Sequence, residues 1–356
     1  MHIVMITNDT NFAWNLRREV LEQFVSMGHS VVLLAHILEF KDNFEKIGVK
    51  VIDIDNDRHG KNPFFDIKLF LKYKTILKNE KPDIVFTNNI KPNVYAGFAC
   101  RMLKIKYVAN ITGLGTPVEN PGKLQKLTVF LYKLGIAKVS TIFFQNKENQ
   151  EFFLSHEMIP EAAKVVLLPG SGVNIESHPL LPWPEGPVHF LFAARIFKEK
   201  GIDYFLSAAE KFASDDIIFD VCGPCDDPKY AEILKNNKFV VYHGLQNDLL
   251  PFYSKCSCLV NPSYYPEGMN NVVLEAAACG RPVITSDRAG CREVAEDGVT
   301  GFVVPIKDGQ AVLNAVEKFL AMTAEERKKM GLAGRAKIEK EFDRQFVVKY
   351  YLEEIG

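Results

Sequence analysis

Residues 266–280 read Pro-Glu-Gly-Met-Asn-Asn-Val-Val-Leu-Glu-Ala-Ala-Ala-Cys-Gly. A loop with proline and glycine leads into an almost wholly apolar segment that ends at Gly280, and residues 281–285, Arg-Pro-Val-Ile-Thr, predict a buried strand. A helix that is apolar on every side belongs in a protein interior, so the carboxylate of Glu275 is costly unless strong hydrogen-bond donors meet it. The hydroxyls of a bound sugar or ribose are suitable donors.

Glu267 comes just before the same predicted helix. Free backbone N–H groups and the positive end of the helix dipole gather anions at such a position. Two carboxylates that flank an anion-binding helix start predict a nucleotide-sugar site. The alternative is a loop glutamate followed by a capped, buried helix.

This stretch resembles the E-x7-E signature of the retaining glycosyltransferases of family 4, which have the GT-B fold. The resemblance extends from Met1 to the end of the chain and is most specific in the second half. It implies an α/β protein with two Rossmann-like domains facing each other across a cleft, and a C-terminal helix that crosses back to the first domain. It also implies that Glu275 holds the ribose and Glu267 the donor sugar. The intervening residues implied to grip sugar and phosphate are Gly268, Met269, Asn270 and Asn271.

Length and composition agree with two soluble domains. The chain has 356 residues, of which 47% are hydrophobic and 24% charged, with a formal net charge of −1. No apolar run approaches the roughly 20 residues of a membrane span, and residues 1–6 predict a strand, not a signal peptide. Seven cysteines, an odd number, suit a reducing compartment. We therefore expect a cytoplasmic protein.

Strands and helices alternate along both halves, which predicts parallel βαβ units. The strands expected in the first half are 2–7, 30–35, 49–53, 84–87, 107–111, 141–145 and 165–168. Those expected in the second half are 188–194, 217–222, 239–242, 258–261, 282–285 and 301–304. Helices are expected between the strands, among them 16–27 and 93–103. Four prolines within 178–187 predict a semi-rigid linker. The expected domains are 1–175 with the tail helix 342–356, for the acceptor, and 188–341, for the nucleotide sugar.

A second group of residues completes the predicted donor site. Arg195 and Lys200 follow the first strand of the second domain, and cations beside helix N–H groups hold a diphosphate well. They match the family's Arg-x4-Lys-Gly pattern, which implies that they bind the donor pyrophosphate and stabilise the leaving group; a solvated basic loop is the alternative. Gly223 follows a strand where a compact residue lets a nucleotide approach. His243, Gly244 and Leu245 follow the next strand and resemble the family's glycine-containing loop, which implies that they line the base.

Three polar loops follow strands of the first domain, at 8–15, 87–93 and 110–116. Similar segments to the last two occur in family members that build bacterial surface polysaccharides, which implies acceptor binding. Turn and cap roles are the alternative for the single asparagines. The expected acceptor residues are Asn8, Asn88, Lys91, Asn110, Thr112 and Gly113. Many relatives have a histidine or an acidic residue near 110–112. This chain has Asn110 and Thr112 there instead, so no general base is identified.

Three other patterns suggest metal or redox chemistry, and we interpret none of them that way. Cys222 and Cys225 have the spacing of a thioredoxin motif, and Cys256 and Cys258 extend the set to four possible zinc ligands. Because Cys258 lies in an apolar strand, buried thiols are the better interpretation. The acidic residues in 53–57 do not fit a calcium loop and predict a solvated turn. We expect no metal and no cofactor.

The resulting hypothesis is a retaining, metal-independent glycosyltransferase. It would move a sugar, such as an N-acetylhexosamine, from a UDP-sugar to a glycan acceptor on a polyprenyl diphosphate, in the synthesis of capsule, exopolysaccharide or O-antigen. With no protein nucleophile identified, we favour front-face attack, in which the departing phosphate accepts the proton. The alternatives are a GT-B epimerase or phosphorylase, and a non-catalytic protein that binds sugar nucleotides.

Charge distribution suggests where the acceptor is presented. Residues 1–168 contain 22 Lys and Arg against 17 Asp and Glu, and the remainder contains 21 against 27. This asymmetry argues against a nucleic-acid partner for the whole chain. The predicted helices 65–78 and 123–137 combine apolar side chains with several lysines. They predict peripheral contact with an anionic membrane, at the inner face of the plasma membrane; the alternative is ordinary amphipathic helices that cover the sheet.

Overall fold

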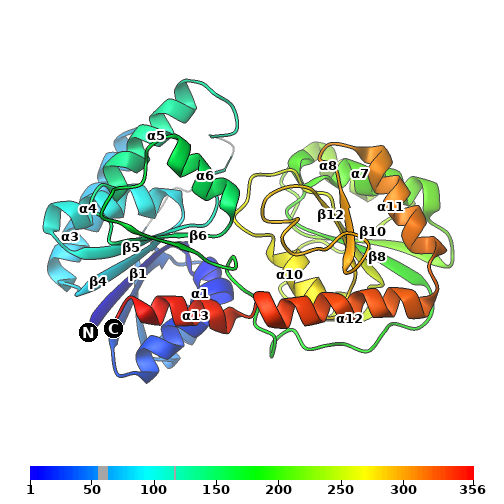
Figure 1. Ribbon diagram of the computed structural model, residues 1–356, viewed down its shortest axis with the longest axis horizontal. Coiled ribbons are helices and arrows are strands. Elements are labelled where there is room, and N and C mark those ends of the chain that lie inside the picture. Colours follow the sequence, from blue (N-terminus) through cyan, green and yellow to red (C-terminus); the bar gives the residue numbers. More distant parts are fainter. Residues whose placement is uncertain (55–62, 116–117) are drawn as a thin grey trace. The chain divides into compact units, whose positions relative to one another are not determined.

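The computed structural model describes residues 1–54, 63–115 and 118–356, which form two compact units (Figure 1). The first unit comprises Met1–Ser171, Glu267–Met269 and Arg344–Gly356, and the second comprises Gly172–Pro266 and Asn270–Asp343. Most of the acidic turn expected at 53–57 lies outside the described residues.

The first unit contains a seven-stranded parallel sheet in the order β3-β2-β1-β4-β5-β6-β7. Its strands are β1 (His2–Asp9), β2 (Ser30–His36), β3 (Val49–Asp53), β4 (Ile84–Asn88), β5 (Lys106–Ile111), β6 (Thr141–Phe144) and β7 (Lys164–Leu167). The helices are α1 (Thr10–Ser26), α2 (Lys41–Lys46), α3 (Pro63–Glu80), α4 (Gly97–Leu103), α5 (Lys123–Ile136), α6 (Lys147–Ser155) and α13 (Arg344–Glu353).

Helices cover both faces of this sheet (Figure 1). On β1, Ile3 and Met5 pack in the core formed with α1, α2 and α13, while Val4 and Ile6 pack in the core formed with α3, α4, α5 and α6. Successive side chains of a strand point to opposite faces, so a strand covered on both faces is apolar at every position. This explains why the strands read as continuous apolar runs.

Two helix boundaries differ from those expected from sequence. The helix expected from Leu16 starts at Thr10, because the Asp9 side chain accepts a 2.7 Å hydrogen bond from the Phe12 N–H and caps the first turn. Most of the loop expected at 8–15 is therefore helical. The helix expected over 93–103 starts with a π-helical segment, Pro92–Ala96, before α4.

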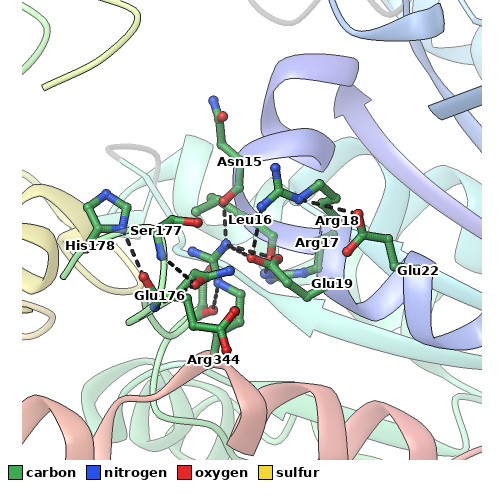
Figure 2. Close-up of polar contacts among 12 residues, drawn as sticks. Asn15, Leu16, Arg17, Arg18, Glu19, Glu22, Glu176, Ser177, His178 and Arg344 are labelled. Atoms are coloured by element: carbon green, nitrogen blue, oxygen red, sulfur yellow. Dashed lines mark hydrogen bonds and ion pairs between the residues drawn. The ribbon is translucent and has the colours of Figure 1, made fainter. Parts of the chain in front are cut away.

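The C-terminal helix α13 packs on the first unit, as expected. Arg344, the first residue of α13, donates to the Asn15 carbonyl at 2.7 Å and to both carboxylate oxygens of Glu19 at 3.1 Å (Figure 2). Arg344 and Glu19 are both buried. Breaking such a pair leaves a buried charge without compensation, so this contact fixes α13 against α1.

The second unit contains a six-stranded parallel sheet in the order β10-β9-β8-β11-β12-β13. Its strands are β8 (Val188–Ala193), β9 (Ile217–Cys222), β10 (Val241–Tyr242), β11 (Cys258–Asn261), β12 (Val283–Ser286) and β13 (Gly301–Val304). Its helices are α7 (Ile202–Phe212), α8 (Pro228–Asn236), α9 (Leu250–Lys255), α10 (Asn271–Ala278), α11 (Gly309–Ala321) and α12 (Ala324–Glu341). The predicted α/β fold with two parallel sheets is confirmed.

The proline-rich stretch 178–187 is fixed to the second unit. Arg281, fully buried, donates to the Pro182 carbonyl at 2.6 Å, and Arg335 donates to the His178 carbonyl at 2.7 Å. The expected semi-rigid linker is therefore held along one unit by guanidinium contacts. Within the described ranges, no helix combines the length and apolarity needed to span a bilayer.

Candidate functional site

The predicted site residues gather at the carboxyl ends of strands in both units. In open parallel sheets, ligands bind where the strand order reverses, which is between β1 and β4 in the first sheet and between β8 and β11 in the second. Arg195 and Lys200 follow β8, and residues 262–270 connect β11 to α10. Asn8 lies in β1, and the loop with Lys91 follows β4.

Lys200 is a buried cation in the second unit. It ends a short 3-10 helix, Lys198–Lys200, and its Nζ lies 5.3 Å from the centroid of the Tyr265 ring. Burial, with a smaller contribution from the Arg195 charge, lowers the pKa of Lys200 to about 7. Arg195 is exposed and packs against the Phe197 ring. Because an anion would favour the charged form of Lys200, this pair suits a diphosphate.

Gly201 is the reason that Lys200 can take this position. It adopts a φ of 82°, and a Cβ there would come within 2.4 Å of the Pro262 carbonyl oxygen on the loop after β11. Only glycine fits both the left-handed conformation and the close approach. In the Lys-Gly part of the sequence pattern, Lys200 is thus the cation, and Gly201 allows the loop after β8 to approach the loop after β11.

Glu275 has a protein partner that the sequence did not reveal. The hydroxyl of Tyr253, within α9, donates a 2.9 Å hydrogen bond to the Glu275 carboxylate. Tyr253 is fully buried and Glu275 is half-buried, so α10 is less completely enclosed than its composition predicts. Burial, and then the charge of Glu275, raise the pKa of Tyr253 well above its ordinary value. The hydroxyl therefore stays protonated and aims the carboxylate.

The residues around the start of α10 have different surroundings. Asn270 is buried and its amide donates to the Asn261 side chain at 3.0 Å, which fixes the helix start. The Oδ1 atom of Asn271 is buried and has no hydrogen-bond partner among the described residues. An acceptor left in this state at a helix start is available to a ligand donor such as a sugar hydroxyl.

Residues 267–269 belong by their contacts to the first unit. The Asn146 amide donates to the carbonyl oxygens of Glu267, at 3.0 Å, and Gly268, at 2.6 Å. A Cβ on Gly268 would lie 2.5 Å from the Thr112 carbonyl oxygen, so glycine is required by this packing. Met269 is buried, with a 6% exposed side chain. Gly268 and Met269 thus position the loop that carries Glu267.

The predicted base-lining loop is held by hydrogen bonds behind it. The Gly223 N–H donates to the Gly244 carbonyl at 2.7 Å, and a Cβ on Gly223 would lie 1.7 Å from the Ala194 carbonyl oxygen. Gly223 is therefore required by packing between strand ends, not only by nucleotide approach. Nothing lies within 4 Å of a Cβ built on Gly244, and Leu245 is 65% exposed. This leaves an accessible apolar surface of the kind a nucleobase packs on.

His243 is oriented by a shared carboxylate. Its Nε2 lies 2.7 Å from one oxygen of Asp220, and the Nδ1 of His189 lies 2.7 Å from the other. Burial acts to raise the pKa of Asp220, but the hydrogen bonds from the two histidines prevail and hold it below its ordinary value. Asp220 stays ionised and fixes the His243 ring at the start of the predicted base-lining loop.

In the first unit, one side chain joins the three predicted acceptor loops. The Oδ1 of Asn89 accepts from the Asn8 N–H at 3.1 Å, and its Nδ2 donates to the Thr112 hydroxyl at 3.1 Å. Asn89 has a φ of 71°, a conformation that asparagine tolerates better than most residues. Gly113, with a φ of 131°, follows Thr112. The ends of β1, β4 and β5 are therefore held as one polar surface.

Asn88 and Asn110 take structural positions instead of the acceptor contact expected for them. Both are buried, and the Tyr351 hydroxyl connects them: it accepts from the Asn110 amide at 2.8 Å and donates to Asn88 Oδ1 at 3.2 Å. Arg17 Nε also donates to Asn88 Oδ1, at 3.0 Å. These amides sit beneath the loops and tie α1 and α13 to the sheet, so their side chains do not face an acceptor.

Lys91 stands two residues after Asn89 in the chain. Its Nζ is 3.2 Å from Asp66 on α3, and both side chains are mostly buried. Tyr95, one turn along the chain, hydrogen-bonds to the same carboxylate; burial first, then Asp66, raise its pKa. Asp66 and Tyr95 were not expected from sequence. Their contacts depend on how α3 packs against the π-helical segment, and local sequence patterns do not reveal that packing.

The cysteines are buried or half-buried free thiols. Burial raises the pKa of Cys222 to about 12 and that of Cys225 above its ordinary value, so neither favours the thiolate that redox exchange requires. Among the described residues, no group of three or more His, Cys, Asp or Glu is arranged to hold a metal ion.

Both halves of the chain match known protein families. A family model described as glycosyl transferases group 1 matches residues 187–322, and one described as glycosyl transferase 4-like matches residues 10–146. The two matches fall one in each half of the chain and together span most of it.

Among curated proteins, the chain is 25% identical to the N,N'-diacetylbacillosaminyl-diphospho-undecaprenol alpha-1,3-N-acetylgalactosaminyltransferase of Campylobacter jejuni, over 99% of this chain and 97% of that protein. It is also 25% identical to the capsular polysaccharide biosynthesis glycosyltransferase CapM of Staphylococcus aureus, over 80% of this chain and 79% of that one. Among solved structures, Anabaena HepE in complex with UDP and glucose aligns with a TM-score of 0.80 at 16% identity, covering 100% and 99% of the two chains.

Proposed function

The chain belongs to the glycosyltransferases of the group 1 and 4-like family, with the GT-B fold, and from this premise we propose which reaction it catalyses. We propose that it moves a sugar, with retention of configuration, from a UDP-sugar to a glycan acceptor on a polyprenyl diphosphate, in the synthesis of a bacterial surface polysaccharide. The similarity to the Campylobacter transferase along nearly the whole of both chains supports the lipid-linked acceptor and an N-acetylhexosamine as the sugar.

One observation carries the donor half of the proposal: the buried Lys200 lies beside Arg195 at the point where the second sheet reverses its strand order. Both cations would neutralise the diphosphate and stabilise the charge that develops on it as it leaves. Glu275, aimed by Tyr253, would accept hydrogen bonds from the ribose. Residues 243–245 would line the base, and HepE, solved with UDP, supports uridine.

The proposed chemistry is a front-face substitution. The bond between the sugar C1 and the β-phosphate oxygen breaks, and a bond from C1 to the acceptor oxygen forms on the same face. The acceptor proton passes to the departing phosphate, which serves as the base. Glu267, Gly268 and Asn271 would hold the donor sugar. Because Arg195 and Lys200 take up the negative charge, we propose that the reaction needs no metal ion.

The acceptor half is proposed on the first unit. Asn8, Lys91, Thr112 and Gly113 lie on or beside the polar surface that Asn89 holds together. We leave Asn88 and Asn110 out of the proposed acceptor contacts because they are buried beneath it. The lysines of α3 and α5 would hold this unit on an anionic membrane at the cytoplasmic face, where lipid-linked acceptors are presented.

A panel of nucleoside diphosphates and sugar nucleotides tests the donor assignment by thermal shift. The proposal expects UDP and one UDP-sugar to stabilise the protein more than the corresponding ADP and GDP compounds. Transfer with that UDP-sugar should then require an acceptor. Release of an epimerised sugar would favour a GT-B epimerase, and binding without transfer or hydrolysis would favour a non-catalytic sugar-nucleotide protein.

Two substitutions examine the named residues. Glu275→Ala and Lys200→Ala should each reduce kcat/KM by a factor of roughly 30 to several thousand, because loss of a desolvated charged contact costs about 2–5 kcal/mol. Lys318→Ala, near the end of α11, is a control outside the proposed site. Near-normal kinetics in either folded site variant would contradict the donor assignment.

A further inference from the structure

An apolar groove opens between helices of the first unit, on the side of the sheet that carries α3, α4 and α5. Its volume is about 390 Å³. Its apolar lining comes from α3, the π-helical segment, α4 and α5: Phe70, Val94, Phe98, Leu127, Leu131 and Leu134. Water in such a groove finds few polar partners, so an apolar ligand would replace it favourably.

Part of the groove lining is polar. Asp66 and Tyr95 also line it, and Asp66 pairs with Lys91 at 3.2 Å. Lys91 stands two residues after Asn89, the side chain that joins the ends of β1, β4 and β5. The Asp66–Lys91 pair therefore connects the lining of the groove to the loop after β4, on which the acceptor is proposed to bind.

Two of the apolar side chains that line the groove are exposed to solvent. Ile67 on α3 is 57% exposed, and Leu127 on α5 is 53% exposed. Leu71 on α3 and Phe130 on α5 do not line the groove, but they are also 51% and 57% exposed. Exposed apolar side chains that share one opening mark a binding site more often than a gap in packing.

The lysines on the helices that line the groove favour an anionic ligand. Helix α5 contains Lys123, Lys126 and Lys133 and no acidic residue, and all three lysines are exposed. Lys68 is exposed on α3. A cationic surround favours an anionic headgroup, and an apolar floor favours a hydrocarbon chain. A neutral helix of a partner protein would use the floor but not the charges.

We propose that this groove binds the first isoprene units of a lipid-linked acceptor, with the diphosphate held near Lys91. The proposal rests on the proposed function, because it assigns the lipid part of that substrate. It adds a chain-length dependence: the enzyme recognises the hydrocarbon itself and not only the sugar and diphosphate.

Soluble acceptors of graded chain length test this without a membrane. The acceptors carry one sugar diphosphate on a C5, C10 or C15 isoprenoid chain, below their micelle concentrations. Wild type should show KM falling by about tenfold or more from C5 to C15, because additional carbons enter an apolar site. Leu127→Ser/Leu131→Ser should lose this dependence while keeping its kcat with the C5 acceptor.

Leu124→Ser is the matched control, since Leu124 is 52% exposed on α5 but does not line the groove. It should retain the chain-length dependence. Leu127→Ser alone provides a second groove variant at an exposed position, in case the double variant does not fold. Equal KM for C5 and C15 acceptors in wild type, or an unchanged dependence in the groove variants, would overturn the proposal.

A binding measurement separates this inference from the proposed function. Farnesyl diphosphate should bind wild type at least about tenfold more tightly than inorganic diphosphate, and the groove variants should lose that difference. If the groove binds farnesyl diphosphate but no acceptor is glycosylated, the proposed function fails and the groove stands. If the variants lose only vesicle binding, the groove faces a bilayer and the proposal is wrong. If they lose only self-association, the groove binds a second copy of the chain and the proposal is also wrong.

Discussion

The hydroxyl of Tyr253 donates a 2.9 Å hydrogen bond to the carboxylate of Glu275. Tyr253 is itself fixed, because it is fully buried and its carbonyl accepts a 2.7 Å hydrogen bond from the buried Arg281. A carboxylate held in one orientation loses little freedom when it binds a ribose hydroxyl. Tyr253 is thus a positioning residue for the proposed ribose contact.

Tyr253→Phe should weaken UDP binding by roughly 10- to 150-fold, since a hydrogen bond to a charged group contributes about 1.5–3 kcal/mol. Isothermal titration with UDP and with 2′,3′-dideoxy-UDP measures the effect. If the tyrosine acts through the ribose contact, the substitution should change affinity for UDP much more than for the dideoxy compound.

Tyr230→Phe is the matched control for this prediction. The Tyr230 hydroxyl donates to Asp203 at 3.1 Å in the same unit, and Tyr230 is also buried. Its loss should leave UDP affinity unchanged. Equal losses for UDP and the dideoxy compound in Tyr253→Phe would assign the tyrosine a purely structural role.

UDP affinity should depend on the ionisation of Lys200. Its pKa in the free protein is lowered to about 7, chiefly by burial, and a bound diphosphate favours the charged form and raises that pKa. Below pH 7 the lysine is already protonated. Above pH 7 binding must take up a proton, so affinity should fall by at most about tenfold per pH unit until the pKa of the complex is reached.

Isothermal titration calorimetry with UDP between pH 7 and 9, in buffers of different ionisation enthalpy, measures this proton uptake. This range lies above the last phosphate ionisation of the nucleotide, near 6. Lys200→Arg should flatten the profile, because arginine stays charged. A wild-type affinity that is constant from pH 7 to 9 would show that Lys200 is not neutral in the free protein or does not contact the diphosphate.

Transfer should survive treatment with EDTA. In the proposed site, Arg195 and Lys200 would take the role of a metal ion beside the leaving diphosphate, and we expect initial rates within about twofold of the untreated enzyme. Activity lost on chelation and restored by added Mg²⁺ or Mn²⁺ would contradict this expectation.

Binding to anionic vesicles should depend on the lysines of α5. Lys126→Glu/Lys133→Glu should weaken sedimentation with phosphatidylglycerol vesicles by at least about 30-fold, because each basic residue near the surface contributes about 1 kcal/mol. Raising the salt concentration should weaken wild-type binding in the same direction. Wild type and neutral phosphatidylcholine vesicles should associate weakly.

The control reverses the same number of charges elsewhere. Lys235 and Lys255 are exposed in the second unit, and Lys235→Glu/Lys255→Glu should leave vesicle binding nearly unchanged. If the two double variants lose binding equally, net charge and not the α5 surface governs association.

The fold was predictable because buried parallel strands are apolar at every position and helices separate them. The pattern around Glu267 and Glu275 likewise identified the enzyme family. Local boundaries were less predictable: α1 begins six residues before Leu16, where the Asp9 side chain caps its first turn. Pattern reasoning that begins a helix where its periodic apolar spacing begins misses such a start.

Side-chain partners distant in sequence account for the remaining differences. Asn88 was expected at the surface because it follows an apolar strand, yet its partners are Arg17, 71 residues away, and Tyr351, 263 residues away. The Tyr253–Glu275 contact likewise depends on how α9 and α10 pack. Residue type and spacing identify a candidate site, but tertiary packing decides which polar side chains face a ligand.

The central claim is retaining transfer from a UDP-sugar to a lipid-linked acceptor, and the anomeric configuration of the product tests it most directly. The enzyme is incubated with UDP-N-acetylgalactosamine, or the UDP-sugar selected by thermal shift, and a sugar diphosphate on a C15 isoprenoid. The one-bond C1–H1 coupling of the new linkage is then measured by NMR. We expect wild type to form an α-linked product from the α-linked donor, and Glu275→Ala to form almost none. A β-linked product, or a donor that is only hydrolysed or epimerised, would contradict it.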